Sequence, residues 1–320
     1  MLLGWFDANE RDLPWREPGL SGWQILISEI MLQQTPVARV VEPWREWVRR
    51  WPVPSAMAAA SPGDVLRAWE KLGYPRRALR LHECARVLAA DHDDKVPDDV
   101  ATMLTLPGIG DYTARAVACF AYGQSVPVVD TNVRRVLARA VHGRAEPGNP
   151  SKKDLADAEA VLPRDPDGTY ASSTPRFSAA LMELGALVCT ARNPDCARCP
   201  LSCAWVEAGK PAHTGPPKRV QKFAGTDRQV RGLLLDVLRG TEGPVVRDRL
   251  DIVWPTDTAQ RDRALDRSVG AGGGGEDVLD GGAGADWLVG DPGADIFVFS
   301  ALDDPAGGQD TIGLRCPAHP

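Results

Sequence analysis

The stretch LTLPGIGDYTARA at residues 104–116 decides how this chain folds. Pro107, Gly108 and Gly110 predict a tight turn between two helical segments, because the glycines allow backbone conformations and a close phosphate approach that a Cβ would block. The amide groups that open the second helix then face an anion. Asp130, within the downstream VVDTNV, adds a carboxylate beside this turn. We interpret the combination as a clamp for a DNA backbone with an acidic group next to it.

The region around this turn is predicted to be helical. Residues 22–140 alternate helical patterns with short Pro/Gly breaks and have almost none of the two-residue alternation of strands. Trp44, Trp47 and Trp51 recur at the spacing of one helix face, so we assign them to the core rather than to base stacking. The sequence predicts an all-α fold.

Length and apolar patterning set further bounds. The 320 residues are enough for two domains with substantial cores. No apolar run approaches the roughly 18 residues that a membrane span requires, and the N-terminus lacks the layout of a signal peptide. We therefore expect a cytoplasmic protein with no membrane partner.

The net charge of −6 is unevenly distributed. The last 51 residues contain nine acidic residues and one basic residue, so residues 1–269 carry a net charge of +2. Because this bias is mild, phosphate contacts must come from local basic patches. Each patch has the alternative of being a solvated helix face; the patches are Arg76-Arg77 with Arg80, Arg134-Arg135 and Lys218-Arg219.

Seven cysteines in an intracellular-type sequence argue against a disulfide framework. Cys84 and Cys119 lie in apolar helical patterns and are most simply core residues. Thiolates spaced by six, two and three residues hold zinc or an iron–sulfur cluster, and four cysteines of this chain have that spacing: Cys189, Cys196, Cys199 and Cys203.

Glu29 lies in WQILISEIMLQQT, residues 23–35, with apolar neighbours on both sides. An acid in such a helix is paired, functional or directed outward. Burial would raise the pKa of its carboxyl, which suits a general acid at neutral pH. These residues alone support a functional and an exposed glutamate equally.

Several motifs in this order resemble the A/G-specific adenine DNA glycosylases, the MutY family of the helix-hairpin-helix superfamily. They are the hairpin with its downstream aspartate, the helix around Glu29, DLPWR at residues 12–16, and KLGY at residues 71–74. The resemblance is clearest over residues 1–210 and extends to about residue 269. It implies a two-lobed, monomeric, bacterial and nucleoid-associated enzyme of base excision repair. Its partner would be double-stranded DNA with adenine mispaired with 8-oxoguanine or guanine.

The resemblance also implies roles for three side chains. Glu29 would protonate N7 of an adenine flipped out of the duplex, and Asp130 would stabilise the positive charge that develops on the deoxyribose. We expect helix N-termini to keep Asp130 ionised, although it also fits an ordinary helix N-cap; the family favours a retaining course. Tyr112 stands where bifunctional endonuclease III relatives have a lysine that forms an imine. We therefore expect cleavage of the N-glycosidic bond alone.

Other residues are implied in DNA contact. Gln33 and Gln34 would fill the vacated stack or contact the opposing base; the alternative is polarity at a helix C-terminus. Many relatives have two tyrosines that wedge the duplex where this chain has Tyr74-Pro75, so the second wedge is missing or replaced. The remaining predicted DNA-binding residues are Arg77, Pro107, Gly108 and Gly110.

The family holds a [4Fe–4S] cluster on four cysteines, with five residues before the last ligand where this chain has three. We therefore expect Cys189, Cys196 and Cys199 to be ligands, and the shorter spacer puts Cys203 in question as the fourth. Structural zinc is the alternative, although Cys₄ zinc sites usually have two paired C-x2-C units.

We expect five segments along the chain, of which the last is a tail at residues 270–320. A helix-hairpin-helix domain would span residues 22–130, and an iron–sulfur domain would combine residues 1–21 with 131–210. Residues 211–225 are typical of a linker. Residues 226–269 suggest a truncated, winged-helix-like unit in place of the Nudix-like domain that reads 8-oxoguanine in longer relatives.

The composition changes abruptly at residue 270, where three nonapeptides follow: GGGGEDVLD, GGAGADWLV and GDPGADIFV. They resemble the calcium-binding β-roll repeats of secreted RTX proteins, with Asp277, Asp286 and Asp295 as the calcium ligands. Three repeats are about the minimum for a stable stack. We favour a fusion or a gene-model accident for residues 270–320, and disorder of this tail stays open.

Three alternatives remain at this point. A glycosylase for thymine or oxidised pyrimidines is opposed by Glu29, because a pyrimidine has no N7 to protonate. A catalytically impaired DNA-binding relative is suggested by the shortened cysteine loop and the lost C-terminal domain. A secreted calcium-binding protein rests on the tail alone and conflicts with the missing signal peptide.

Overall fold

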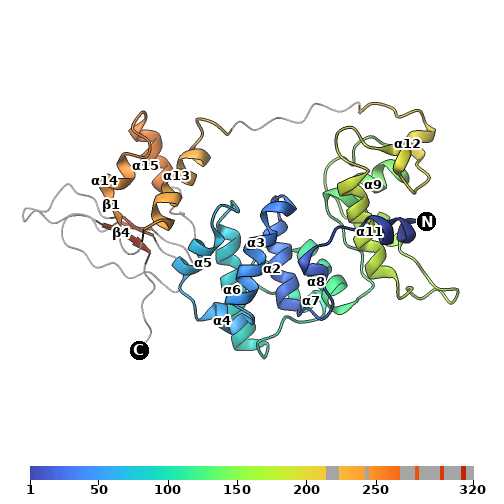
Figure 1. Cartoon of the computed structure of the whole chain (residues 1–320), viewed down its shortest axis with the longest axis horizontal. Coiled ribbons are helices and arrows are strands. Elements are labelled where there is room, and N and C mark those ends of the chain that lie inside the picture. Colours follow the sequence, from blue (N-terminus) through green and yellow to red (C-terminus); the bar gives the residue numbers. More distant parts are fainter. Residues whose placement is uncertain (214–222, 242–244, 267–277, 281–295, 299–310, 315–320) are drawn as a thin grey trace, which may run out of the picture. The chain divides into compact units, whose positions relative to one another are not determined.

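The chain divides into two compact units, which we describe separately (Figure 1). The first comprises residues 1–54 and 87–217, and the second residues 55–86 and 218–320. The computed structural model describes only part of the second unit and nearly all of the first; the described residues are 1–213, 223–241, 245–266, 278–280, 296–298 and 311–314.

The regular secondary structure of the described part of the first unit is helical, apart from a single β-bridge between Arg164 and Tyr170. The α-helices are α1 (Leu2–Asn9), α2 (Gly22–Leu32), α3 (Val41–Arg50), α7 (Val100–Met103), α8 (Asp111–Tyr122), α9 (Thr131–Ala140), α10 (Lys153–Val161), α11 (Thr174–Leu187) and α12 (Ala204–Glu207). Short 3-10 turns are η1 (Pro14–Arg16), η2 (Val37–Arg39) and η3 (Cys196–Arg198). No helix of the described chain is both long enough and apolar enough to cross a membrane.

Helix α2 carries Glu29 into the interior. It begins with a capping box, in which the Gln24 amide donates to Ser21 Oγ at 3.3 Å and the Ser21 amide donates to Gln24 Oε1 at 2.8 Å. Every residue from Ile25 to Met31 is buried. A helix that is apolar on all sides is a core helix, and α2 packs against α8 and α3. The tryptophans predicted to be core residues, Trp44, Trp47 and Trp51, are buried as well.

The predicted hairpin turn lies between α7 and α8. Asp99 caps α7 by accepting a hydrogen bond of 2.7 Å from the Thr102 amide. Gly108 has a φ of +75°, so a residue without a Cβ is needed there. Our expectation of a glycine-specific conformation is wrong for Gly110, because its φ is −99°. A Cβ at Gly110 would meet open space, and the residue acts as the N-cap of α8.

The opposite part of this unit has its own core. Helices α1, α9, α10 and α11 bury one cluster of apolar residues, with α9 packed on α11 and α11 on α1. Its members include Phe6, Val133, Leu137, Leu181 and Leu184. This core fixes the start of α9, where Asp130 lies, against α11 near Gly185.

The second unit has two parts. One consists of helices within residues 54–91, and the other is a small C-terminal assembly of helices and strands. The helices of the first part are α4 (Pro54–Ala58), α5 (Pro62–Trp69) and α6 (Arg76–Asp91), of which α6 continues into the first unit. The C-terminal elements are α13 (Asp227–Arg239), β1 (Val245–Val246), α14 (Arg247–Asp251) and α15 (Thr258–Asp266). Val230, Leu234, Leu250 and Leu265 form their shared core.

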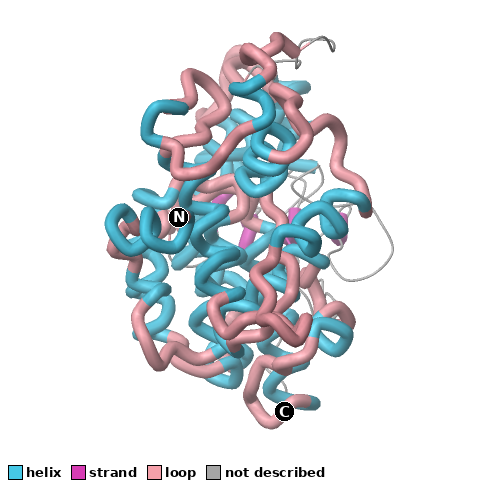
Figure 2. Tube along the Cα trace, turned by 90° about the vertical axis from the view of Figure 1, so that its right-hand side faces the viewer, coloured by secondary structure: helices cyan, strands magenta, loops and turns pink. Residues whose placement is uncertain are grey.

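Within the described chain, strands occur only from β1 onward. Figure 2 shows the strands in magenta among the cyan helices. The sheet order is β1-β4-β3-β2, where β2 is Val278–Asp280, β3 is Ile296–Val298 and β4 is Thr311–Leu314. β2 and β3 pair in parallel with Val278 opposite Ile296, whereas β4 is antiparallel to both β1 and β3. The three predicted calcium ligands, Asp277, Asp286 and Asp295, lie outside the described residues.

Candidate active site

Glu29 and Tyr112 meet inside the first unit. The hydroxyl of Tyr112, at the start of α8, donates a hydrogen bond of 2.8 Å to Oε2 of Glu29 on α2. Glu29 is only 5% exposed. The two helices pack directly on each other, so this contact is set by the core of the unit. The exposed alternative for Glu29 is excluded.

The surroundings of Glu29 favour its protonated form. Burial raises the pKa of the Glu29 carboxyl to about 7, and the hydrogen bond from Tyr112 opposes this rise. The charge of Asp130 raises the pKa further, while the guanidinium of Arg16 lowers it. A group with this pKa exchanges a proton readily at neutral pH. Burial also raises the pKa of Tyr112 well above its usual range, so Tyr112 keeps its proton and acts as the donor.

Asp130 is the N-cap of α9. Its Oδ1 accepts a hydrogen bond of 2.7 Å from the Val133 amide, and its Oδ2 accepts one of 2.8 Å from Asn132 Nδ2. Burial raises the pKa of Asp130, and these two hydrogen bonds oppose the rise. We expected the helix N-terminus to keep Asp130 ionised; in the structure the partial burial of Asp130 is the largest influence on its carboxyl, and it raises the pKa. Sequence spacing cannot show that burial.

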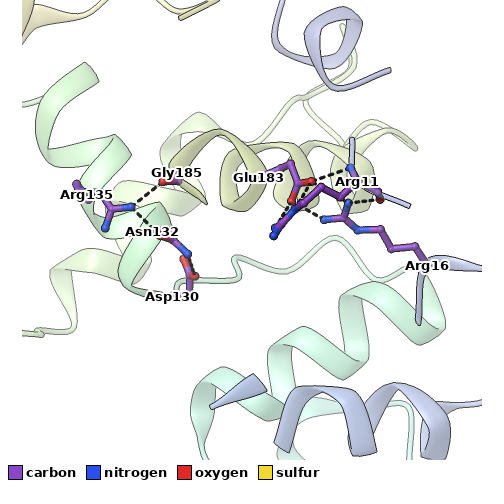
Figure 3. A network of polar contacts seen from close by, with 7 residues as sticks. All are labelled: Arg11, Arg16, Asp130, Asn132, Arg135, Glu183 and Gly185. Atoms are coloured by element: carbon purple, nitrogen blue, oxygen red, sulfur yellow. Dashed lines mark hydrogen bonds and ion pairs between the residues drawn. The ribbon is translucent and has the colours of Figure 1, made fainter. Parts of the chain in front are cut away.

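Asn132 in turn is held by Arg135, as Figure 3 shows. Arg135 Nη2 donates to Asn132 Oδ1 at 2.6 Å and to the Gly185 carbonyl at 2.7 Å. Its Nε donates to the Cys189 carbonyl at 2.7 Å. A continuous set of hydrogen bonds therefore runs from the carboxylate of Asp130 to the backbone of Cys189, the first of the four clustered cysteines.

This network corrects the prediction that Arg134-Arg135 forms a phosphate patch. Arg135 makes the internal contacts just described, and Arg134 Nε binds Asp154 Oδ2 at 2.9 Å with its side chain only 11% exposed. Both guanidinium groups are satisfied by the protein itself. Side chains of adjacent residues on a helix point about 100° apart. The two arginines therefore bind different partners within the protein. Lys218-Arg219 lies outside the described residues.

A second ion cluster joins the N-terminal segment to α11 (Figure 3). The Glu183 side chain is 1% exposed and binds Arg11 Nη2 at 2.7 Å and Arg16 Nη2 at 2.9 Å. Burial alone would raise the pKa of Glu183, but the hydrogen bonds from the two arginines outweigh it and lower the pKa to about 2. Sequence reasoning missed Glu183, because nothing in its local pattern separates it from an ordinary polar helix residue.

The four clustered cysteines line a single cavity of about 160 Å³. Arg139, on α9, enters its wall: Nη1 donates to Cys189 Sγ at 3.5 Å and to the Thr190 carbonyl at 2.7 Å. The guanidinium carbon of Arg139 lies 4.9 Å from the ring centroid of Trp205. Four thiols beside a fixed positive charge fit an anionic thiolate–iron cluster. Cys203 faces the same cavity as the other three despite its short spacer.

The other predicted DNA contacts are distributed over both units. In the first, Gln33 ends α2 and its Nε2 donates to Thr113 Oγ1 at 3.4 Å, while Gln34 is exposed with a φ of +54°. In the second, Tyr74 is 41% exposed. Arg77 is half-buried, with its guanidinium carbon 4.9 Å from the ring centroid of Trp69. Cys84 and Cys119 are buried, as predicted for core residues.

Comparison with known proteins agrees with this geometry. Residues 27–159 match the HhH-GPD superfamily of base excision DNA repair proteins, and residues 189–202 match the iron-sulfur binding domain of endonuclease III. Residues 271–304 match the RTX calcium-binding nonapeptide repeat. Among solved structures, a thermostable thymine-DNA glycosylase is similar, with a TM-score of 0.58 at 28% identity over 65% of this chain and 94% of that one.

These matches define a helix-hairpin-helix protein of base excision repair with an iron–sulfur binding loop. An adenine DNA glycosylase of Mycobacterium tuberculosis is 66% identical over 267 residues, which cover 83% of this chain and 86% of the relative. The human adenine DNA glycosylase is 39% identical over 208 residues, 62% of this chain and 37% of that protein. The chain belongs to the adenine DNA glycosylase family.

Proposed function

We propose that this enzyme excises adenine mispaired with 8-oxoguanine or guanine in double-stranded DNA and leaves an abasic site. The observation that carries the proposal is the buried pair of Glu29 and Tyr112, with Asp130 close enough to raise the pKa of Glu29. An acid that is half protonated at neutral pH beside a second carboxylate is the arrangement that N-glycoside cleavage needs.

Glu29 is the general acid. Its Oε2 accepts the Tyr112 hydrogen bond, so Oε1 carries the proton toward N7 of the flipped adenine. Protonation converts adenine from a poor leaving group into a good one, and the glycosidic bond breaks with its electron pair going to the base. The pKa of about 7 keeps a large fraction of Glu29 protonated when the base arrives.

Asp130 stabilises the positive charge that remains on the deoxyribose. The Val133 amide and Asn132 hold both of its oxygens, which fixes the carboxylate for this task or for a covalent bond to C1′ in a retaining course. Tyr112 has no amine and cannot form an imine with the opened sugar. Strand cleavage therefore does not follow base removal.

DNA contacts are proposed at the turn around Pro107 and at the segments around Gln33 and Tyr74. The turn at Pro107, Gly108 and Gly110 holds the phosphate backbone through the amides that open α8. Open space beside Gly110 supports this role, because a phosphate can approach the backbone there. Gln33 and Gln34 contact the space left by the flipped base, and Tyr74 enters the duplex with Arg77 beside its ring.

The iron–sulfur loop holds a [4Fe–4S] cluster on Cys189, Cys196, Cys199 and Cys203. The match of residues 189–202 to the iron-sulfur binding domain of endonuclease III favours this assignment over zinc. The four cysteines line one cavity, and Arg139 lies beside Cys189 there. When bound, the cluster supplies a structural crosslink. Arg135 and Arg139 then hold the loop carbonyls of Cys189 and Thr190 against α9.

Thymine or uracil removal is the second candidate, because a thymine/uracil-DNA glycosylase of Pyrobaculum aerophilum is 32% identical over 205 residues. The higher identity to adenine glycosylases and the protonatable Glu29 favour adenine. The domain limits, a monomeric state, a cytoplasmic location and calcium binding by the tail stay predictions. The catalytically impaired alternative is disfavoured by the assembled site.

The test is single-turnover excision from a duplex with one adenine opposite 8-oxoguanine, and from a matched adenine opposite thymine. We expect strand breaks only after alkali, excision from the first duplex, and its loss in Glu29→Gln. Glu46→Gln, at an exposed glutamate paired with Arg49, is the matched control and should keep full activity. Thymine release in place of adenine would favour the second candidate, and no release from cluster-loaded protein would contradict both.

A further inference from the structure

The turn between α5 and α6 is held rigidly by its own side chains. Gly73 and Tyr74 have positive φ values of +81° and +50°. Trp69 Nε1 donates to the Gly73 carbonyl at 2.8 Å, and Arg77 Nη2 donates to the same carbonyl at 3.0 Å. A non-glycine residue in the left-handed region persists only where its surroundings determine it. The backbone under Tyr74 is therefore fixed, while its side chain remains 41% exposed.

Two guanidinium groups lie against the Tyr74 ring. The guanidinium carbon of Arg77 is 5.7 Å from the ring centroid. Burial lowers the pKa of Arg77 to about 10, so it remains charged at neutral pH. The second group comes from the C-terminal assembly: Arg228, in the first turn of α13, has its guanidinium carbon 4.5 Å from the same centroid.

Arg228 also lies over a second exposed ring. Its guanidinium carbon is 5.9 Å from the centroid of Phe223, which is 57% exposed. Tyr74, Arg228 and Phe223 thus place two exposed aromatic rings and a cation next to one another on the second unit. Exposed rings beside cations are what bases and phosphates of nucleic acid bind, by stacking and by charge.

We propose that Arg228 is a positioning residue for DNA recognition: it holds the Tyr74 ring in the orientation that enters the duplex beside the mispair. The inference rests on the proposed function, because the wedge role of Tyr74 belongs to it. Pro75 follows Tyr74 where many relatives have a second tyrosine, so the C-terminal unit supplies the missing support.

The planarity of arginine matters to this role. A guanidinium stacks flat on an aromatic ring, whereas a lysine ammonium keeps the charge but loses the stack. A cation–π contact at an exposed site corresponds to about a two- to fivefold effect on an equilibrium constant. We expect an effect of this size on DNA binding, because an unsupported Tyr74 ring must be ordered when the duplex binds.

The test uses full-length, cluster-loaded protein and compares Arg228→Ala, Arg228→Lys and Arg231→Ala. Arg231 is the matched control: it lies on the same helix with the same charge, and its Nε donates to the Asp227 carbonyl at 3.3 Å. The Kd for an adenine:8-oxoguanine duplex is measured in the Glu29→Gln background. Insertion of the wedge is followed by the fluorescence of 2-aminopurine placed beside the mispair.

We expect Arg228→Ala and Arg228→Lys to weaken binding two- to fivefold and to reduce the fluorescence rise, with Arg231→Ala close to the parent protein. In a Tyr74→Ala background the Arg228→Ala change should have no further effect. Equal weakening by Arg228→Ala and Arg231→Ala, or an undiminished effect without Tyr74, would overturn the inference. A parent enzyme that releases no adenine would overturn the proposed function instead, so the two failures are distinguishable.

Discussion

The Tyr112 hydroxyl lies 2.8 Å from Oε2 of Glu29, and it joins two residues that are 83 positions apart in the chain. The contact has two opposite consequences for Glu29. Packing of α8 on α2 removes water and raises the pKa of the carboxyl, while the hydrogen bond itself stabilises the carboxylate. Burial is the larger effect, so the acid is poised near neutral pH.

Glu29→Gln should stabilise the fold while it abolishes excision. The folded-state pKa of Glu29 is raised from 4.5 to about 7, so the folded state binds the proton more tightly and stability falls as pH rises through this window. The amide has no charge to bury. We expect a gain of about 3 kcal/mol at pH 8 and none at pH 4, from the constant of 1.36 kcal/mol per pKa unit. Urea denaturation at both pH values measures it, and an equal effect at both would contradict the burial of a charge.

Tyr112→Phe should move the pH dependence of excision upward. The lost hydrogen bond favoured the carboxylate, so without it the pKa of Glu29 rises and the protonated form persists to higher pH. The basic limb of the single-turnover rate profile shifts accordingly, and the maximal rate falls by up to about tenfold. Tyr122→Phe is the control, because that hydroxyl on the same helix donates to the Val96 carbonyl. A basic limb that moves downward would refute the donor role of Tyr112.

Gly185→Ala should disable the site without touching either carboxylate. A Cβ at Gly185 would lie 2.6 Å from Asn132 Cβ and 3.0 Å from the Asn132 carbonyl oxygen, so the first turn of α9 must shift. Asn132 holds Asp130, and misplacement of a reacting group costs about 100-fold in rate. Gly4→Ala, in a helical position with open space, should leave the rate unchanged. Single-turnover kinetics decides between these outcomes.

Glu183→Gln should destabilise the first unit at neutral pH. The depressed pKa of Glu183, about 2 against 4.5, contributes stability that is present above pH 4.5 and lost as pH falls toward 2. Because Arg11 is 34% exposed, solvent screening reduces the effect, and we expect about 2 kcal/mol at pH 7. Glu46→Gln, at an exposed ion pair, should cost less than about 0.5 kcal/mol. A loss that stays constant down to pH 2 would indicate packing rather than charge.

Cys203→Ser should remove the iron–sulfur cluster as fully as Cys189→Ser does. All four cysteines line one cavity, so we expect Cys203 to be the fourth ligand despite its shortened spacer. Iron content per chain and absorbance at about 400 nm report the cluster directly. Cys84→Ala, at a buried cysteine of the second unit, is the control and should retain the iron. Full iron in Cys203→Ser would assign the fourth ligand to another group.

Most of the fold prediction rested on short sequence motifs. The helical pattern around Glu29 and the Pro107-Gly108 turn are decided by neighbours in sequence, and the structure has both where we expected them. The basic residues were harder to assign. Arg134 and Arg135 have the composition of a phosphate patch, yet both bind partners inside the protein. The spacing of residues in the sequence predicts which of them share a helix face. It does not predict which other part of the chain packs against that face.

The sequence by itself determined the helical character of residues 22–140, the hairpin, the set of four thiols and the absence of a lysine at position 112. These features follow from residue identity and short-range spacing. Tertiary structure alone decided that Glu29 is buried against Tyr112, that Asp130 is desolvated, and that Glu183 binds two arginines. The reason is physical: desolvation and charge pairing depend on residues brought together from distant parts of the chain, and no local pattern encodes their distance.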